Sequence, residues 1–136
     1  MKKGYLRVFV IALLFALSVV MSSTVEAAGK SASGSVGGVS THASLNIGVN
    51  YATASTTSSS SSTILTVSCT LRYYCTNSSG NAEIKTATKN ASGMTSSVTA
   101  SPTGTGTNVR SISAYSSHSA TLGADYWSTT LAITYQ

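Results

Sequence analysis

Apolar and hydroxyl-bearing side chains alternate along the last part of the chain, residues 109–136, in two runs. The first run carries Ile112, Ala114, His118 and Ala120, and the second carries Trp127, Leu131, Ile133 and Tyr135. A period of two residues predicts β-strands with one apolar and one polar face. Between the runs, Gly123-Ala124 fits a two-residue type II′ turn, because glycine tolerates the positive φ of the first turn position. The pattern therefore predicts an antiparallel hairpin.

The position of this turn determines which residues oppose one another in the hairpin. Ala120 faces Trp127, Ser116 faces Leu131, Ala114 faces Ile133 and Ile112 faces Tyr135. The large apolar residues of the pair then fall on one face, with the exceptions of Val109, Tyr115, Leu122 and Tyr126. A slip of one residue would mix the two faces, so the register is well specified.

Further segments show the same alternation. One face carries Ala43, Leu45, Ile47, Val49 and Tyr51 in residues 42–53, and Leu65, Val67, Cys69, Leu71 and Tyr73 in residues 63–74. Residues 82–89 alternate Ile84, Thr86 and Thr88 with Glu83, Lys85 and Lys89. A charged outer face is a common protection of an edge strand, so this segment is expected at an edge. A short strand is expected in residues 94–100, with Met94, Val98 and Ala100 on one side.

The stretches between these strands are rich in Gly, Ser, Thr and Asn. Residues 77–81 and 90–93 are predicted turns, and residues 102–108 are a predicted connection into the last hairpin. Residues 54–62 have no apolar side chain larger than Ala, which leaves a loop and a solvated strand continuation as alternatives. Residues 28–40 are expected to be a flexible lead-in or a weak edge strand.

The strand pattern predicts the fold class. A composition dominated by Ser, Thr, Gly and Ala also occurs in disordered, mucin-like tracts, but the persistent alternation favours a folded domain. A single sheet would leave its apolar face in water, whereas two sheets packed face to face cover it. We therefore expect an all-β protein, with residues 28–136 forming one small antiparallel β-sandwich of six or seven strands.

The first 27 residues have the pattern of an export signal. Three cations precede an uncharged apolar run over residues 8–21, and Val25-Glu26-Ala27 fits the small-residue rule for signal peptidase. About 14 apolar residues are too few for a membrane span, which needs about 20. We expect a cleaved signal peptide over residues 1–27, a secreted or cell-envelope-associated protein, and no transmembrane segment in the mature chain.

Without this leader the chain has a weak positive charge. It carries five cations and two carboxylates, a net charge of +3, from Lys30, Arg72, Lys85, Lys89 and Arg110 against Glu83 and Asp125. Nucleic-acid binding depends on neighbouring Lys and Arg side chains that neutralise several phosphates, and these cations are spread along the sequence. We therefore expect no nucleic-acid partner. A cell-envelope component or another protein is the expected kind of partner.

Cys69 and Cys75 are the two cysteines of the chain. An oxidising compartment favours a disulfide between them. In one straight strand, however, six residues span about 20 Å at about 3.3 Å each, and a disulfide needs Cα atoms within about 7 Å. A bent chain with a bridge and a straight strand with separate thiols remain as alternatives. A metal site is not expected, because this spacing lacks an adjacent histidine.

The sequence offers few groups for catalysis. His118 and Asp125 could form a triad with a serine, but no G-x-S-x-G motif exists and Asp is common beside turns. In the predicted hairpin His118 faces Thr129 on the inward side, where a hydrogen bond to a hydroxyl or backbone group accounts for it. His42 falls on the polar side of its strand, and Glu83 offsets neighbouring lysines. We expect no catalytic residues, no cofactor and no enzymatic activity.

The aromatic residues divide by strand face. Tyr51, Tyr73, Trp127 and Tyr135 fall on inward positions and are predicted core residues. Tyr74, Tyr115 and Tyr126 fall on outward positions. Exposed aromatic rings among hydroxyls can stack on sugars or contact a partner, and they can also pack across strands on an open face. Both interpretations remain open for these three tyrosines, which are the candidate surface-contact residues.

The ending of the chain supports a resemblance. Residues 110–127, which read Arg-Ser-Ile-Ser-Ala-Tyr-Ser-Ser-His-Ser-Ala-Thr-Leu-Gly-Ala-Asp-Tyr-Trp, resemble the closing hairpin of small Ser/Thr-rich secreted β-proteins of Gram-positive bacteria. A more distant similarity is to bacteriocins of the lactococcin 972 type, which are small exported β-sandwiches acting at the cell envelope. The first resemblance implies a non-enzymatic binding or structural module, and the second implies a secreted toxin.

We predict that the leader is removed after Ala27, so that the secreted protein begins at Ala28. Intact-mass analysis of the protein recovered from the medium measures this directly. Recovery of a chain that retains Met1 in the membrane fraction would contradict the export signal.

Overall fold

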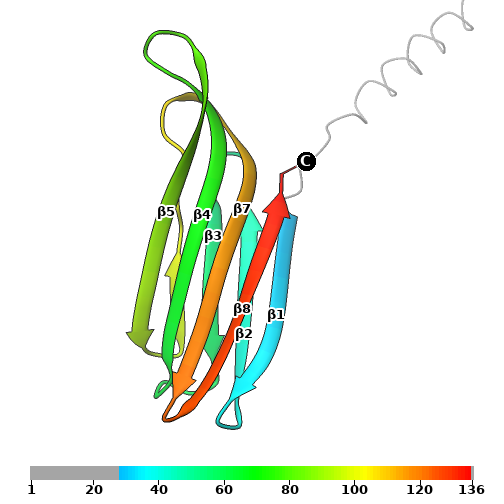
Figure 1. The fold of residues 1–136 in the computed structure, drawn as a ribbon, viewed down its shortest axis with the longest axis vertical. Helices are drawn as coiled ribbons and strands as arrows, with labels where there is room; N and C mark the ends of the chain where they lie inside the picture. Colours follow the sequence, from blue (N-terminus) through cyan, green and yellow to red (C-terminus); the bar gives the residue numbers. More distant parts are fainter. Residues whose placement is uncertain (1–27, 136) are drawn as a thin grey trace, which may run out of the picture.

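The computed structural model describes residues 28–135, which form eight strands in two antiparallel sheets packed face to face (Figure 1). The predicted leader, residues 1–27, lies outside the described residues. The strands are β1 (Ala28–Val36), β2 (Val39–Ile47), β3 (Ala52–Ser58), β4 (Ile64–Thr76), β5 (Ala82–Met94), β6 (Ser97–Ala100), β7 (Thr107–Leu122) and β8 (Asp125–Thr134). The first sheet has the order β1-β2-β3-β6, and the second has the order β5-β4-β7-β8. The fold is the small antiparallel β-sandwich that the alternation predicts.

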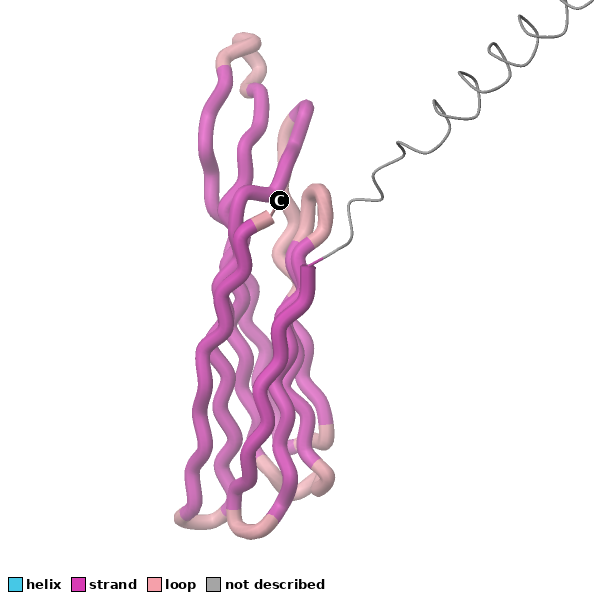
Figure 2. Tube along the Cα trace, turned by 90° about the vertical axis from the view of Figure 1, so that its right-hand side faces the viewer, coloured by secondary structure: helices cyan, strands magenta, loops and turns pink. Residues whose placement is uncertain are grey.

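The strands run along the length of the sandwich, and the β4–β5 hairpin extends past the other strands at one end (Figure 2). The core lies between the two inner faces. Its buried members include Leu45 and Ile47 from the first sheet and the predicted inward set of β4, namely Leu65, Val67, Cys69, Leu71 and Tyr73. Alanines occupy many of the remaining inner positions: Ala43, Ala52, Ala54, Ala100, Ala114 and Ala120. These small side chains let the two sheets approach closely.

The C-terminal hairpin has the predicted register. Ala120 opposes Trp127, Ser116 opposes Leu131, and Ala114 opposes Ile133. The amide of Tyr135 donates to the carbonyl of Ile112 at 2.8 Å, which extends the pairing to its expected end. Gly123 has φ of 61° and no positive φ occurs at Ala124, as a type II′ turn requires.

A β-bulge at Ile112 corrects one part of the hairpin prediction. Arg72 of β4 opposes Ser113, whereas Tyr73 opposes Ser111, so Ile112 is an extra residue in β7. The bulge reverses the alternation beyond it. Ser111 is therefore buried, with no hydrogen-bond partner for its hydroxyl among the described residues, and Val109 packs against the core. The prediction had placed Val109 off the apolar face.

The strand predicted over residues 42–53 is wrong in its second half. β2 ends at Ile47, and the chain reverses at Gly48, whose amide donates to the carbonyl of Tyr51 at 2.8 Å. Val49 and Tyr51 are exposed instead of lying in the core. The Tyr51 ring lies against Gly48, where a Cβ would overlap it, so glycine permits this reversal.

Two weakly patterned segments also differ from expectation, because small or polar side chains form their strands. Residues 52–58 form β3 with Ala52, Ala54 and Thr56 buried, although a loop had been one alternative for residues 54–62. The predicted turn at residues 90–93 is continuous strand in β5, and Met94 at its end is exposed. Residues 28–36 form the edge strand β1, which was one of the two alternatives for residues 28–40, and the separate strand β3 makes the strand total eight instead of six or seven.

Trp127 joins the edges of the two sheets. It projects from β8 and lies against Gly34 of β1, with its side chain half-buried at the border of the core. A Cβ at residue 34 would overlap the indole Nε1 and Cδ1 atoms. The indole therefore occupies space that glycine alone leaves open in β1.

We predict that Gly34→Ala lowers the free energy of unfolding by about 1–3 kcal/mol, the usual cost of overpacking. In a Trp127→Ala background the same change should cost much less, because the overlapping ring is gone. Urea unfolding of the four proteins gives the coupling energy. Gly93→Ala is the matched control, since it adds a methyl group to edge strand β5 where the nearest atom lies at 3.7 Å.

Equal costs for Gly34→Ala in the two backgrounds would contradict this packing. Trp127→Ala alone should cost less than the roughly 3–5 kcal/mol of a fully buried aromatic residue, because the side chain is only half-buried.

Candidate functional site

The outer face of the second sheet is a regular array of polar side chains, here called the hydroxyl face. The register aligns its outward residues in rows that cross β5, β4, β7 and β8 in that order. Four successive rows are Ser92-Thr66-Ser119-Ser128, Asn90-Ser68-Ser117-Thr130, Thr88-Thr70-Tyr115-Ala132 and Thr86-Arg72-Ser113-Thr134. Some hydroxyls pair across strands, as Thr70 Oγ1 does with Thr88 Oγ1 at 2.9 Å. The others remain free for an external partner.

The three predicted surface tyrosines all lie on this face. Tyr74, Tyr115 and Tyr126 are 40%, 50% and 65% exposed. Tyr126 opposes Thr121 near the β7–β8 turn, and Tyr74 opposes Arg110 toward the other end of the sheet. Tyr115 lies between them, and six residues of β7 separate it from Thr121, about 20 Å. The tyrosines therefore mark points along the face and do not form one cluster.

The outer face of the first sheet differs from the hydroxyl face. Its strands also present hydroxyls, among them Ser33, Ser44, Ser55 and Thr99. It carries no aromatic side chain, Lys or Arg among the outward positions of its four strands, and its titratable side chain is His42, which bonds Ser33 at 3.0 Å. Of the two outer faces, that of the second sheet therefore carries the aromatic rings and the cations at its outward strand positions.

A groove of about 930 Å³ crosses one end of the hydroxyl face. The hydroxyl face contributes Thr70, Arg72, Ser113, Tyr115 and Thr134 to its lining, together with Thr86 and Ala132. The first residues of β1, including Lys30, and the small apolar stretch of Ala114 and Ile133 also line it. Lys30 and Arg72 are exposed. The groove thus combines two cations, one aromatic ring and several hydroxyls. Arg72 lies between the inward residues Leu71 and Tyr73, so the alternation predicts its outward position, but no local pattern in the sequence brings Lys30 near it.

His118 lies in the core and bonds a hydroxyl with each ring nitrogen. It is 2% exposed, with Nδ1 2.9 Å from Thr56 Oγ1 and Nε2 2.7 Å from Ser116 Oγ. The Thr56 hydroxyl donates its proton to the carbonyl of Thr66 at 2.9 Å, so its oxygen accepts from Nδ1–H. Nε2 of the neutral ring then accepts from the Ser116 hydroxyl. This assignment satisfies every group of the network.

The Ser116–His118 pair has the hydrogen bond of a nucleophile and its base, with Thr56 in the orienting position. Ser116 and Thr56 have no exposed surface, however, so a substrate would have no access to the serine oxygen. His118 opposes Thr129 as expected, whereas Asp125 opposes Leu122, four residue pairs away and about 13 Å along the strand. The structure does not bring His118 and Asp125 together.

Cys69 and Cys75 are free and buried, which contradicts the alternative of a disulfide between them. β4 pairs with β5 without interruption from Ile64 to Thr76, so the chain between the two cysteines is extended. Burial raises the pKa of the Cys69 thiol to about 11, which keeps it protonated and unreactive.

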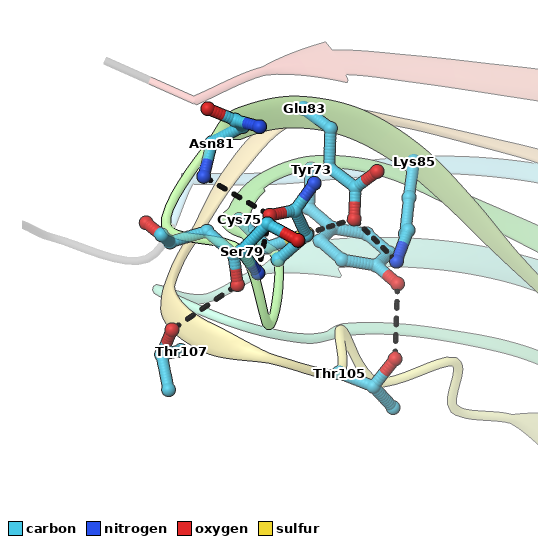
Figure 3. A network of polar contacts seen from close by, with 10 residues as sticks. Tyr73, Cys75, Ser79, Asn81, Glu83, Lys85, Thr105 and Thr107 are labelled. Carbon is cyan, nitrogen blue, oxygen red and sulfur yellow. Dashed lines mark hydrogen bonds and ion pairs between the residues drawn. The ribbon is translucent and has the colours of Figure 1, made fainter.

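Cys75 lies near the end of the β4–β5 hairpin, in the polar network of Figure 3. Its thiol donates to Glu83 Oε1 at 3.8 Å, and the same carboxylate pairs with Lys85. The hydrogen bond and the charge of Glu83 raise the pKa of Lys85. Across the hairpin base, the Tyr73 hydroxyl bonds Thr105 at 3.3 Å. These contacts stabilise the projecting hairpin, and the carboxylate of Glu83 is already paired with Lys85.

Residues 28–135 contain no group of three or more His, Cys, Asp or Glu side chains placed to hold a metal ion. No helix in this part of the chain has the length and apolar character of a membrane span. Comparisons with protein-family models, with curated proteins and with solved structures found no match to the chain. The fold therefore defines the class of protein, a small antiparallel β-sandwich.

The buried position of His118 predicts a pH-dependent stability. Burial lowers its pKa below the usual 6.5, so the unfolded chain binds a proton that the folded chain does not. Above about pH 6.5 the imidazole is neutral in both states and the free energy of unfolding has its full value. As the pH falls below about 6.5 toward the folded-state pKa, protonation of the unfolded chain lowers that free energy. We expect the free energy of unfolding to fall between pH 7 and pH 5, by at most about 1.4 kcal/mol per pH unit.

Urea unfolding at several pH values measures this dependence. His118→Gln should flatten it, even if the variant is less stable at every pH, whereas the exposed His42 provides the control His42→Gln, which should retain it. An unchanged pH dependence in His118→Gln would assign the effect to other groups.

Proposed function

We propose that the protein is a non-enzymatic binding module of the cell envelope or extracellular space, and that it binds through the hydroxyl face. The observation that carries the proposal is the co-location of three exposed tyrosines, two groove-lining cations and rows of aligned hydroxyls on one sheet and its border. The outer face of the other sheet has hydroxyls but no tyrosine, Lys or Arg at the outward positions of its strands. A location outside the cell rests on the predicted leader at residues 1–27.

The chemistry of the face supports a polyol or glycan partner. A hydroxyl both donates and accepts hydrogen bonds, so aligned Ser and Thr residues can match the hydroxyl groups of a sugar polymer. Each such bond contributes about 0.5–1.5 kcal/mol net, and many together are needed for useful affinity. Exposed tyrosine rings add apolar surface for a sugar ring.

The state of the titratable groups supports a non-enzymatic role. Catalysis usually needs a titratable group with access to substrate and a partner that tunes it. His118, Cys69 and Cys75 are buried, and Glu83 is paired with Lys85. Asp125 is exposed beside a turn, far from His118.

We predict that the purified mature chain co-sediments with isolated bacterial cell envelopes, and that Tyr115→Ser with Tyr126→Ser weakens this binding several-fold. Tyr51→Ser is the matched control, because Tyr51 is a comparably exposed tyrosine outside the hydroxyl face. Thermal unfolding of each variant separates loss of binding from loss of fold. Equal weakening by Tyr51→Ser, or no envelope binding by the wild type, would contradict the proposal.

The same preparations test the other classes of function. Hydrolysis of peptides, esters or cell-wall polymers by the wild type, abolished in a His118→Ala, Asp125→Ala double variant, would establish an enzyme instead. Killing of related bacteria by the purified protein would favour the toxin that the more distant resemblance implies.

A further inference from the structure

The groove at the end of the hydroxyl face has an unbalanced positive charge. Lys30 and Arg72 line it, and neither forms an ion pair with the described carboxylates. Glu83 pairs with Lys85 on the inner side of β5, opposite the inward residues of β4 and not on the outer face predicted for them, and Asp125 lies at the opposite end of β8. Among residues 28–135, the groove therefore offers two cations to an external anion with no carboxylate side chain paired to either of them.

Arg72 and Tyr115 are diagonal neighbours on this face. Thr70 opposes Tyr115 and Arg72 opposes Ser113, so the two side chains lie in adjacent rows of adjacent strands. Diagonal positions are about 7–8 Å apart, within reach of one ligand unit for side chains of this length. A guanidinium can hold a carboxylate or phosphate through two parallel hydrogen bonds.

The remaining lining suits the uncharged part of such a ligand. The Tyr115 ring is 50% exposed and offers a flat apolar surface for a pyranose ring. Thr70, Ser113 and Thr134 surround it with groups that both donate and accept hydrogen bonds. Lys30, reaching the groove from the other sheet, supplies a second point charge.

We propose that this groove binds an anionic glycan, a sugar or polyol chain that carries carboxylate or phosphate groups. The inference rests on the proposed function and specifies its ligand class. Arg72 holds the anionic group, Tyr115 stacks on the adjoining ring, and Lys30 contacts the next anionic unit. Two cations are too few for duplex nucleic acid, where the affinity comes from many neighbouring phosphates.

Isothermal titration of the mature chain at low and physiological salt tests the proposal with four polymers. Polygalacturonate supplies carboxylates, purified teichoic acid supplies phosphates, dextran is the neutral control, and duplex DNA is the polyanion without a glycan. We expect binding of at least one of the first two, weakened by salt, and much weaker binding of dextran and DNA.

Arg72→Gln should lower the affinity for the bound polymer roughly tenfold or more, as expected for loss of a charge-assisted hydrogen bond. Lys89→Gln removes the same charge outside the groove and should change the affinity by less than about threefold, through net charge alone. Tyr115→Ser should also weaken binding, and thermal unfolding verifies that each variant is folded.

Equal losses of polymer affinity in Arg72→Gln and Lys89→Gln, or an affinity for DNA equal to that for the anionic glycans, would overturn this inference. Either result would indicate non-specific attraction of the protein to polyanions. Envelope binding that none of the anionic polymers competes for would overturn this inference and leave the proposed function standing. Absence of envelope binding together with absence of polymer binding would overturn both.

Discussion

The two sheets meet in a core that contains one connected polar network, and the alignment of the sandwich depends on it. Thr56 of β3 donates to the carbonyl of Thr66 in β4 and accepts from His118 in β7, so a single side chain in the first sheet bonds two strands of the second. Ser116 completes the network at the other ring nitrogen. A shift of β3 would leave several buried polar groups unpaired, at about 1–3 kcal/mol each. Apolar contacts between alanines discriminate weakly between alignments, so these directional bonds determine how the sheets lie over one another.

The pattern of side chains predicted the sandwich and strands such as β4 and β8, because large apolar residues mark the inner face of those strands. Leu65 and Leu71 in β4, and Leu131 and Ile133 in β8, are such residues, and both strands formed as expected. β3 was harder to recognise, since its inward residues are two alanines and Thr56. Its place is determined by tertiary contacts, above all by the imidazole of His118, which a local pattern does not contain.

The candidate site, like the fold, was predictable only where the local alternation of side chains determines it. Strand parity alone placed Tyr74, Tyr115 and Tyr126 on an outer face, and all three are exposed there. The groove depends instead on the meeting of β1 with the second sheet, which involves residues more than forty positions apart, such as Lys30 and Arg72. The bulge at Ile112 was likewise invisible, because Ser111 and Ile112 read as an unbroken alternation until the register with β4 is known. Long-range pairing decides both features.

The two cysteines constrain the route by which the chain reaches this structure. In the folded domain the extended strand between Cys69 and Cys75 holds the thiols apart, and both are sealed in the core. In the unfolded chain they are six residues apart and meet freely. An oxidant therefore acts on the two states in opposite ways: it leaves the native domain untouched, but a bridge closed before β4 forms would bend that strand and exclude the sandwich. Folding and thiol oxidation therefore compete for the same segment. The faster β4 pairs with β5 and β7, the smaller the fraction of chains in which a Cys69–Cys75 bridge prevents folding.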